Sequence, residues 1–161
     1  MILKKASVLL MWNIFYISTL LFPKVFFAAE FSQVRPSNEE FMALPEANWL
    51  KNGGDFYNRN YSQLDQINTS NVGNMIPIWR SHLAGSGVEA RFSGEAQPIV
   101  QDGTMYIITG ADDVFALSVE TGEILWSSFA NLTSEISTVC CGWTSRGVAV
   151  GEDKVFVGQL D

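Results

Sequence analysis

Two adjacent cysteines, Cys140 and Cys141, are the only cysteines in the 161-residue chain, and Arg146 follows five residues later. Adjacent Cα atoms lie about 3.8 Å apart, whereas the Cα atoms of ordinary disulfides lie roughly 4.4–6.8 Å apart. A bond between the two sulfurs would close a strained small ring, which is a poor staple but a rigid, polarizable surface for a flat ligand. Arg146 adds a planar cation suited to carboxylates. Two buried free thiols beside a surface arginine are the open alternative.

Other residues that could do chemistry are sparse. The single histidine, His82, belongs to no Ser-His, Cys-His or His-rich pattern, so we expect a solvated loop residue. Four aspartates lie where the chain is predicted to turn: Asp112, Asp113, Asp153 and Asp161. No catalytic residue and no metal ligand is therefore assigned from these residues.

The charge balance argues against a nucleic-acid partner. The chain has 10 basic and 17 acidic residues, a formal net charge of -7. Three of the basic residues precede Glu30, the first acidic one, so the rest of the chain is more acidic still. Nucleic-acid binding calls for a basic face, and we expect no such partner.

Residues 1–29 are predicted to be an export signal. Lys4 and Lys5 form its basic start, an apolar run follows over 6–22, and Ala28-Ala29 supplies small residues near a cleavage point. Because the run approaches the length of a membrane span, roughly 17–25 residues, an uncleaved anchor facing the periplasm is the alternative. Either way residues 30–161 form the exported domain, and in an oxidising periplasm a disulfide is permissible.

The stretch before the sheet mixes turns and aromatic residues. Gly53-Gly54-Asp55 predicts a turn whose neighbouring aromatics pack against a sheet edge. A short helical turn is expected near Asn71, followed by a strand that ends at Trp79.

From residue 97 onward the pattern is all β. Short strands are predicted at 98–100, 105–108, 114–117 and 124–126, with Asp102-Gly103 and Thr121-Gly122 as turns. Residues 148–157 overlay 98–107, and Trp79 and Trp126 close successive units 47 positions apart. A β repeat of roughly 40–50 residues is typical of propeller blades. The second unit stops after two predicted strands, so we expect one complete blade and partial blades from the N-terminal part of a longer propeller.

Residues 116–126 (ALSVETGEILW) resemble the tryptophan-docking motif AxDxxTGxxxW of quinoprotein propellers, with Ser118 in the place of its Asp. The other matching segments are Gly53-Gly54-Asp55 with Asn60-Tyr61-Ser62, 94–98 (GEAQP), Cys140-Cys141 with Arg146, and 158–161 (GQLD). In this order they resemble the start of a pyrroloquinoline quinone (PQQ)-dependent alcohol dehydrogenase.

The resemblance implies an all-β, eight-bladed propeller with PQQ on its axis. It implies that Cys140 and Cys141 form a disulfide ring that stacks on one face of the quinone. It also implies that Glu95 contacts the cofactor and that Arg146 binds one of its carboxylates. PQQ is flat and carries three carboxylates, which suits a rigid platform beside a planar cation.

The family places its other parts in later blades. These are the catalytic base and the ligands of Ca²⁺ or a lanthanide, and a haem c domain follows in some members. The implied activity is periplasmic oxidation of alcohols by hydride transfer to the quinone, with a cytochrome c as electron acceptor. This chain by itself is then expected to be inactive. The alternative is a non-enzymatic propeller of the outer-membrane assembly type, which binds protein partners. A strained disulfide facing the axis favours the enzyme.

Overall fold

The computed structural model describes residues 34–84, 92–133, 135–136 and 142–160. The predicted leader, 1–29, and the cysteine pair lie outside the described residues. Within the ranges that are described, no helix combines the length and apolar character needed to cross a membrane.

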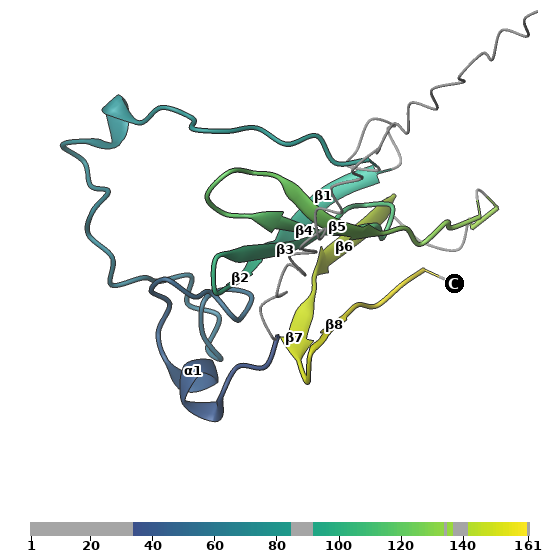
Figure 1. Ribbon diagram of the computed structural model, residues 1–161, viewed down its shortest axis with the longest axis horizontal. Coiled ribbons are helices and arrows are strands. Elements are labelled where there is room, and N and C mark those ends of the chain that lie inside the picture. Colours follow the sequence, from purple (N-terminus) through teal and green to yellow (C-terminus); the bar gives the residue numbers. More distant parts are fainter. Residues whose placement is uncertain (1–33, 85–91, 134, 137–141, 161) are drawn as a thin grey trace, which may run out of the picture. The chain divides into compact units, whose positions relative to one another are not determined.

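Four consecutive strands form an antiparallel sheet in the order β2-β3-β4-β5 (Figure 1). Their bounds are Ile99–Gln101, Thr104–Ile108, Val114–Ser118 and Ile124–Ser128. Asp102 and Gly103, between β2 and β3, have φ of 47° and 76°. Positive φ at both central residues is the backbone of a two-residue hairpin turn that matches the strand twist. The four predicted strands and their turns are confirmed, and we call this sheet the blade.

The predicted repeat is also confirmed. β7 (Ala149–Gly151) and β8 (Lys154–Phe156) form a second antiparallel hairpin. Its turn residues Glu152 and Asp153 have φ of 50° and 58°, so they reproduce the first hairpin's turn without a glycine. Aspartate tolerates this left-handed backbone better than most side chains do.

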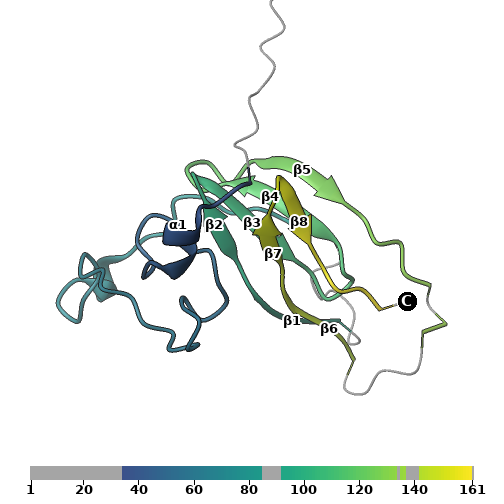
Figure 2. The same cartoon turned by 90° about the horizontal axis from the view of Figure 1, so that it is seen from below.

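A parallel pair of strands, which the sequence did not predict, joins the two repeats. β1 (Phe92–Gln97) runs directly into β2 across Pro98, and β6 (Trp143–Gly147) runs into β7 across Val148. β1 and β6 pair with each other and lie side by side in both ribbon views (Figures 1 and 2). Pro98 has no N–H to donate, so a ladder breaks naturally there.

The hydrophobic core lies where the N-terminal segment and the second repeat pack against the blade. The blade contributes alternate residues of β2 to β4, and Leu50, Val148 and Val150 pack onto them from the N-terminal segment and from the second repeat. Burying one large aliphatic side chain stabilises a fold by about 1.5–3 kcal/mol. The two repeats and the N-terminal segment therefore share one core. Its buried members are Leu50, Ile99, Tyr106, Ile108, Val114, Ala116, Val148 and Val150.

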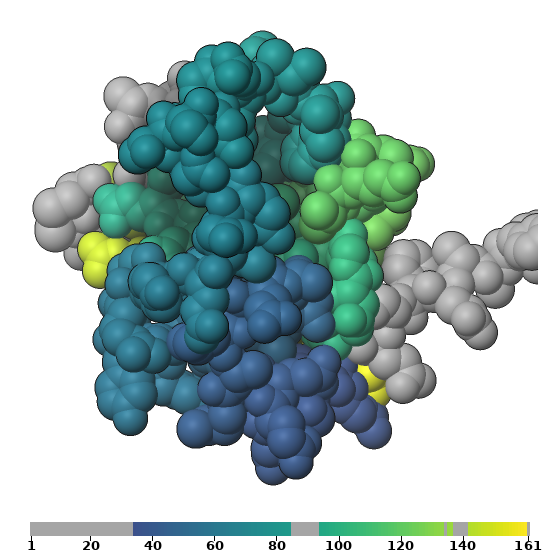
Figure 3. Space-filling view, turned by 90° about the vertical axis from the view of Figure 1, so that its left-hand side faces the viewer, coloured from purple at the N-terminus to yellow at the C-terminus, as the bar shows by residue number. Residues whose placement is uncertain are grey.

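The N-terminal segment begins with a capped helical turn and then joins the blade. In α1 (Asn38–Met42), Ser37 and Glu40 form a capping box. Trp49 then exchanges two backbone hydrogen bonds of 2.8 Å with Val100 at the free edge of β2. Figure 3 shows this segment, in blue, and the residues after it, in teal, running across one side of the molecule.

The prediction that the aromatics near Gly53 pack at a sheet edge holds for Trp49 but is wrong for others. Phe56, Tyr57 and Tyr61 are 65%, 82% and 55% exposed. Two of these rings lie against cations instead: the Lys51 ammonium is 5.1 Å from the Phe56 ring centroid, and the Arg59 guanidinium is 5.4 Å from that of Tyr57.

The predicted strand ending at Trp79 is absent, because residues 75–83 form no ladder in the structure. The predicted helical turn is present as the 3₁₀ turn η1 (Val72–Asn74). Trp79 instead docks on the turn between β4 and β5, where its Nε1 donates to the Val119 carbonyl at 2.8 Å. Its ring lies so close that a Cβ on Gly122 would be 2.4 Å from it.

Ser118 makes a turn contact in the position where the motif has Asp. Its hydroxyl accepts a hydrogen bond from the Thr121 N–H at 3.2 Å, and its carbonyl accepts one from the Gly122 N–H at 2.8 Å. A hydroxyl can thus cap this turn without a carboxylate.

Candidate functional site

Glu95 and Arg146 meet across the β1–β6 pair. The Arg146 Nε donates to Glu95 Oε2 at 3.3 Å, although the two residues lie 51 positions apart in the chain. The parallel pairing explains the contact, because equivalent strands of two repeats lie next to each other. The structure therefore brings together two of the four predicted cofactor residues.

A bulge sets the direction of these side chains. Gly94 is paired with Ser145 and Gln97 with Gly147, so two residues of β1 oppose one residue of β6. The unopposed pair is Glu95 and Ala96, and the single residue is Arg146. A bulge of this kind twists the strand locally and redirects a side chain, which is why bulges occur beside binding sites.

The Glu95–Arg146 pair faces solvent and contributes little to stability. The Arg146 side chain is 82% exposed and the Glu95 side chain 50% exposed. Exposed ion pairs contribute about 0–1 kcal/mol to folding. The structure thus leaves a cation and a carboxylate accessible on one face, where a ligand could reach both.

The donor set fits an anionic planar ligand. A guanidinium carries five N–H donors in a fixed fork, and the contact with Glu95 uses the Nε of Arg146. The terminal nitrogens suit bidentate binding of a carboxylate. Glu95 restricts where the guanidinium points. Cys140 and Cys141 come shortly before β6 in the chain, but they lie outside the described residues.

Two further residues contact the strands that carry Glu95 and Arg146. The Gly53 N–H donates to the side-chain oxygen of Gln97 at 2.5 Å, and Asn52 Nδ2 donates to the Arg146 carbonyl at 3.5 Å. The sequence pattern assigns neither Gln97 nor Asn52 a role at the site. No spacing rule could have found contacts that span 44 and 94 positions.

The loop that makes these contacts is tied internally by Asp55. Its carboxylate accepts the backbone N–H groups of Tyr57 and Arg59 at 2.9 and 3.2 Å and pairs with the Arg59 guanidinium. Burial alone would raise the pKa of Asp55, but the hydrogen bonds and charge of Arg59 and the Tyr57 N–H outweigh it and lower the pKa. The predicted turn at Gly53-Gly54-Asp55 is confirmed, with φ of 69° and 83° at its glycines.

The aspartates expected at turns lie there wherever the structure describes them. Asp112 has φ of 59° and Asp153 has φ of 58°, whereas Asp161 is outside the described residues. Asp112 is 1% exposed and accepts the Leu160 N–H at 2.8 Å, so it also ties the second repeat to the blade. Burial raises the pKa of Asp112, the charge of Asp113 raises it further, and the Leu160 hydrogen bond opposes both.

Metal-binding chemistry is not evident in this part of the chain. No group of three or more His, Cys, Asp or Glu residues suited to a metal occurs among the described residues. His82 is exposed, as predicted.

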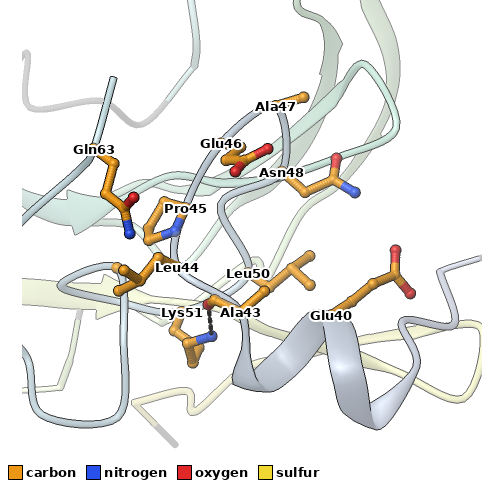
Figure 4. Close-up of a pocket in the computed structure, with 11 residues that line it drawn as sticks. Glu40, Ala43, Leu44, Pro45, Glu46, Ala47, Asn48, Leu50, Lys51 and Gln63 are labelled. Carbon is orange, nitrogen blue, oxygen red and sulfur yellow. Dashed lines mark hydrogen bonds between the residues drawn. The ribbon is translucent and has the colours of Figure 1, made fainter. Parts of the chain in front are cut away.

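A pocket of about 420 Å³ lies beside α1 (Figure 4), and neither Glu95 nor Arg146 lines it. Its cation, Lys51, already donates to the carbonyls of Phe41 and Ala43 at the end of the helix. The pocket therefore has a structural cation, and we assign it no function.

Comparison with known proteins adds independent findings. The family model for the PQQ glucose/ethanol/alcohol dehydrogenase β-propeller domain matches residues 49–157. The quinoprotein alcohol dehydrogenase PedH of Pseudomonas putida is 36% identical over 127 residues, which are 78% of this chain and 21% of that protein. The 1-butanol dehydrogenase (quinone) of Thauera butanivorans is 39% identical over 101 residues, 63% of this chain and 16% of that protein. The chain thus spans about a fifth of the length of these relatives.

Solved structures show the same architecture. A quinohemoprotein alcohol dehydrogenase from Comamonas testosteroni superposes with a TM-score of 0.65 and 29% identity over 78% of this chain and 18% of that one. A europium-containing methanol dehydrogenase superposes with a TM-score of 0.58 and 28% identity over 69% of this chain and 19% of that one. The all-β propeller fold is therefore shared with quinoprotein dehydrogenases.

Proposed function

Because the chain belongs to the family of PQQ glucose/ethanol/alcohol dehydrogenase β-propeller domains, we propose that it serves the PQQ-dependent oxidation of alcohols. The observation that carries the proposal is the Glu95–Arg146 pair, held 3.3 Å apart on two repeats and open to solvent. The matches to alcohol dehydrogenases favour this activity over a protein-binding propeller of the outer-membrane assembly type.

Each site residue has a distinct role in binding the cofactor. Arg146 binds a cofactor carboxylate through its terminal nitrogens, and Glu95 orients the guanidinium while contacting the cofactor itself. Cys140 and Cys141 form a disulfide ring that stacks on one face. When bound, the quinone supplies the hydride acceptor for the alcohol. What this chain contributes is orientation, an effect that lowers the barrier of a reaction between bound partners by several kcal/mol.

The other components of the reaction are inferred from relatives. A europium-containing methanol dehydrogenase supports a lanthanide as the metal, with Ca²⁺ as the alternative. A quinohemoprotein neighbour supports a haem c, and a 1-butanol dehydrogenase (cytochrome c) supports a cytochrome as electron acceptor. We place the catalytic base and the metal ligands outside this chain, within an eight-bladed propeller.

Export completes the proposal. We propose that residues 1–29 direct the protein to the periplasm and are removed near Ala29, since the basic start and apolar run have that order. N-terminal sequencing of exported protein tests this. An intact Met1 in a membrane fraction would favour the anchor instead.

The activity can be tested by dye reduction. The natural protein is purified without quinone, supplied with PQQ and with calcium or a lanthanide, and given ethanol as substrate. We expect turnover that requires both quinone and metal. Residues 30–161 expressed alone should bind the quinone weakly and reduce no dye. Turnover by that segment alone would show that the active site has been misplaced.

A further inference from the structure

One loop contacts both strands of the cofactor pair where the bulge lies. The Gly53 N–H donates to Gln97 Oε1 on β1 at 2.5 Å. The next residue back, Asn52, donates to the carbonyl of Arg146 on β6 at 3.5 Å. Two consecutive residues therefore contact both strands at the bulge: Gly53 binds Gln97, which flanks the bulge on β1, and Asn52 binds Arg146, the residue opposite the bulge on β6.

The loop is built to be rigid at this point. Gly53 is buried, and a Cβ there would be 1.8 Å from Asn58 Oδ1. Asp55, two residues on, closes the loop through its hydrogen bonds to Tyr57 and Arg59. A backbone segment that is buried and closed by hydrogen bonds moves little, so the Gly53 N–H is a fixed donor for Gln97.

Close approach of the loop to β6 depends on Gly147. Its φ is 148°, and a Cβ there would come within 2.8 Å of Asn52 Nδ2 and 2.9 Å of Asn52 Oδ1. Gly147 is also the register partner of Gln97 across the bulge. Because Gly147 has no side chain, Asn52 has room to reach the carbonyl of the neighbouring Arg146.

We propose that Gln97 and Asn52 are positioning residues for cofactor binding, which hold the β1–β6 bulge in the register that points Glu95 and Arg146 at the quinone. This proposal rests on the proposed function of that pair. A strand that slips by one residue turns its side chains to the opposite face. A bulge is the place where such a slip costs least, because its ladder is already interrupted. The hydrogen bonds of Asn52 and Gly53 hold the two strands at the bulge.

The test uses the natural protein, produced without quinone and then titrated with PQQ. Gln97→Met removes the acceptor at nearly constant length, and Asn52→Leu removes the amide donor. Asn48→Leu is the matched control, since Asn48 also braces the N-terminal segment to the blade. It accepts the Asp102 N–H at 2.9 Å, at the far end of β2. Three quantities are measured: the dissociation constant for PQQ, the hydrogen exchange of β1 and β6, and the midpoint of urea unfolding.

We expect Gln97→Met to weaken PQQ binding about tenfold, since one lost hydrogen bond and a tenfold change in affinity are both of the order of 1 kcal/mol. Asn52→Leu should weaken it a few-fold, because its bond is longer. Both should speed exchange in β1 and β6. Asn48→Leu should lower the urea midpoint by about as much as Gln97→Met does, because each loses one hydrogen bond. It should leave the PQQ affinity unchanged. Gln97→Glu keeps an acceptor for Gly53 and should keep slow exchange.

Equal PQQ affinity in Gln97→Met and the unsubstituted protein would overturn the proposal, as would equal weakening in Asn48→Leu. Slow exchange in Gln97→Met would overturn it too, because the brace would then be dispensable for the bulge. A natural protein that binds no PQQ would refute the proposed function and this inference with it. Normal PQQ binding with insensitive variants would refute this inference alone.

Discussion

Replacing Gly122 with alanine should remove the docked tryptophan from the blade. Gly122 has φ of 72°, and a Cβ there would be 2.4 Å and 2.5 Å from two ring carbons of Trp79. Real Cβ atoms do not approach other carbons so closely, so the ring must leave. Trp79 would then lose the hydrogen bond from its Nε1 to the Val119 carbonyl, which is 2.8 Å long.

The expected loss of folding free energy in Gly122→Ala has three parts. Left-handed backbone costs an alanine about 1 kcal/mol. Losing the indole hydrogen bond costs about 1 kcal/mol. Exposing the half-buried ring costs about 1 kcal/mol more, well below the 1.5–3 kcal/mol of a fully buried side chain. We therefore expect Gly122→Ala to lower the free energy of unfolding by about 3 kcal/mol.

Gly103 supplies the matched control. Its φ is 76°, close to that of Gly122, but a Cβ there meets nothing within 4 Å. Gly103→Ala should therefore cost about 1 kcal/mol, from the backbone alone. Urea unfolding of the natural protein, followed by tryptophan fluorescence and by circular dichroism, measures both variants.

A double-mutant cycle isolates the ring. In a Trp79→Leu background, Gly122→Ala should cost no more than Gly103→Ala does. Equal costs for the two glycine substitutions in the unsubstituted protein would refute the reasoning, because the tryptophan would then contribute nothing at that turn.

Three further outcomes are expected. Arg146→Lys keeps the charge but loses the planar fork, so PQQ affinity should fall about tenfold while the urea midpoint stays within error. Burial raises the pKa of Asp112 above its ordinary value of 3.8, so the stability that this carboxyl contributes is present below pH 3.8 and is lost as the pH rises through the raised pKa. Asp112→Asn removes this contribution, so the slope of the unfolding midpoint against pH should be more positive in the variant than in the unsubstituted protein, and parallel pH profiles would contradict it. Mass mapping of exported protein without reductant should show the peptide with Cys140 and Cys141 lighter by two hydrogens; two freely alkylated thiols would exclude the ring.

The blade could be predicted from the sequence because its signals are local. Asp102-Gly103 sets a hairpin within four residues, and short runs of apolar residues bounded by turn residues mark the strands on either side. The second hairpin was found by overlay, although Glu152 and Asp153 replace the usual glycine turn. Repetition therefore compensated for a weaker local signal.

The candidate site was only half predictable. Glu95 and Arg146 were found through their resemblance to a known motif, not through any pattern that placed them 3.3 Å apart. The parallel strands that join them are non-local, and β1 lies in a polar stretch with no alternation to mark it. The contacts of Asn52 and Gln97 run through a side-chain amide and a backbone N–H, which composition does not reveal. The prediction of a strand before Trp79 was wrong. Ile76 and Ile78 lie exposed in a loop, and Trp79 docks on the β4–β5 turn, so these apolar residues do not mark a ladder.

The parallel pairing of β1 with β6 has a consequence for the order of folding. The whole blade, β2 to β5, is the crossover connection between these two strands. Closing so long a loop is entropically costly, and parallel pairs form slowly. Glu95 and Arg146 can meet only after the blade has folded and the next repeat has reached it. A chain in which only the first blade has folded therefore holds Glu95 but not Arg146, and the Glu95–Arg146 pair is completed only by the second repeat.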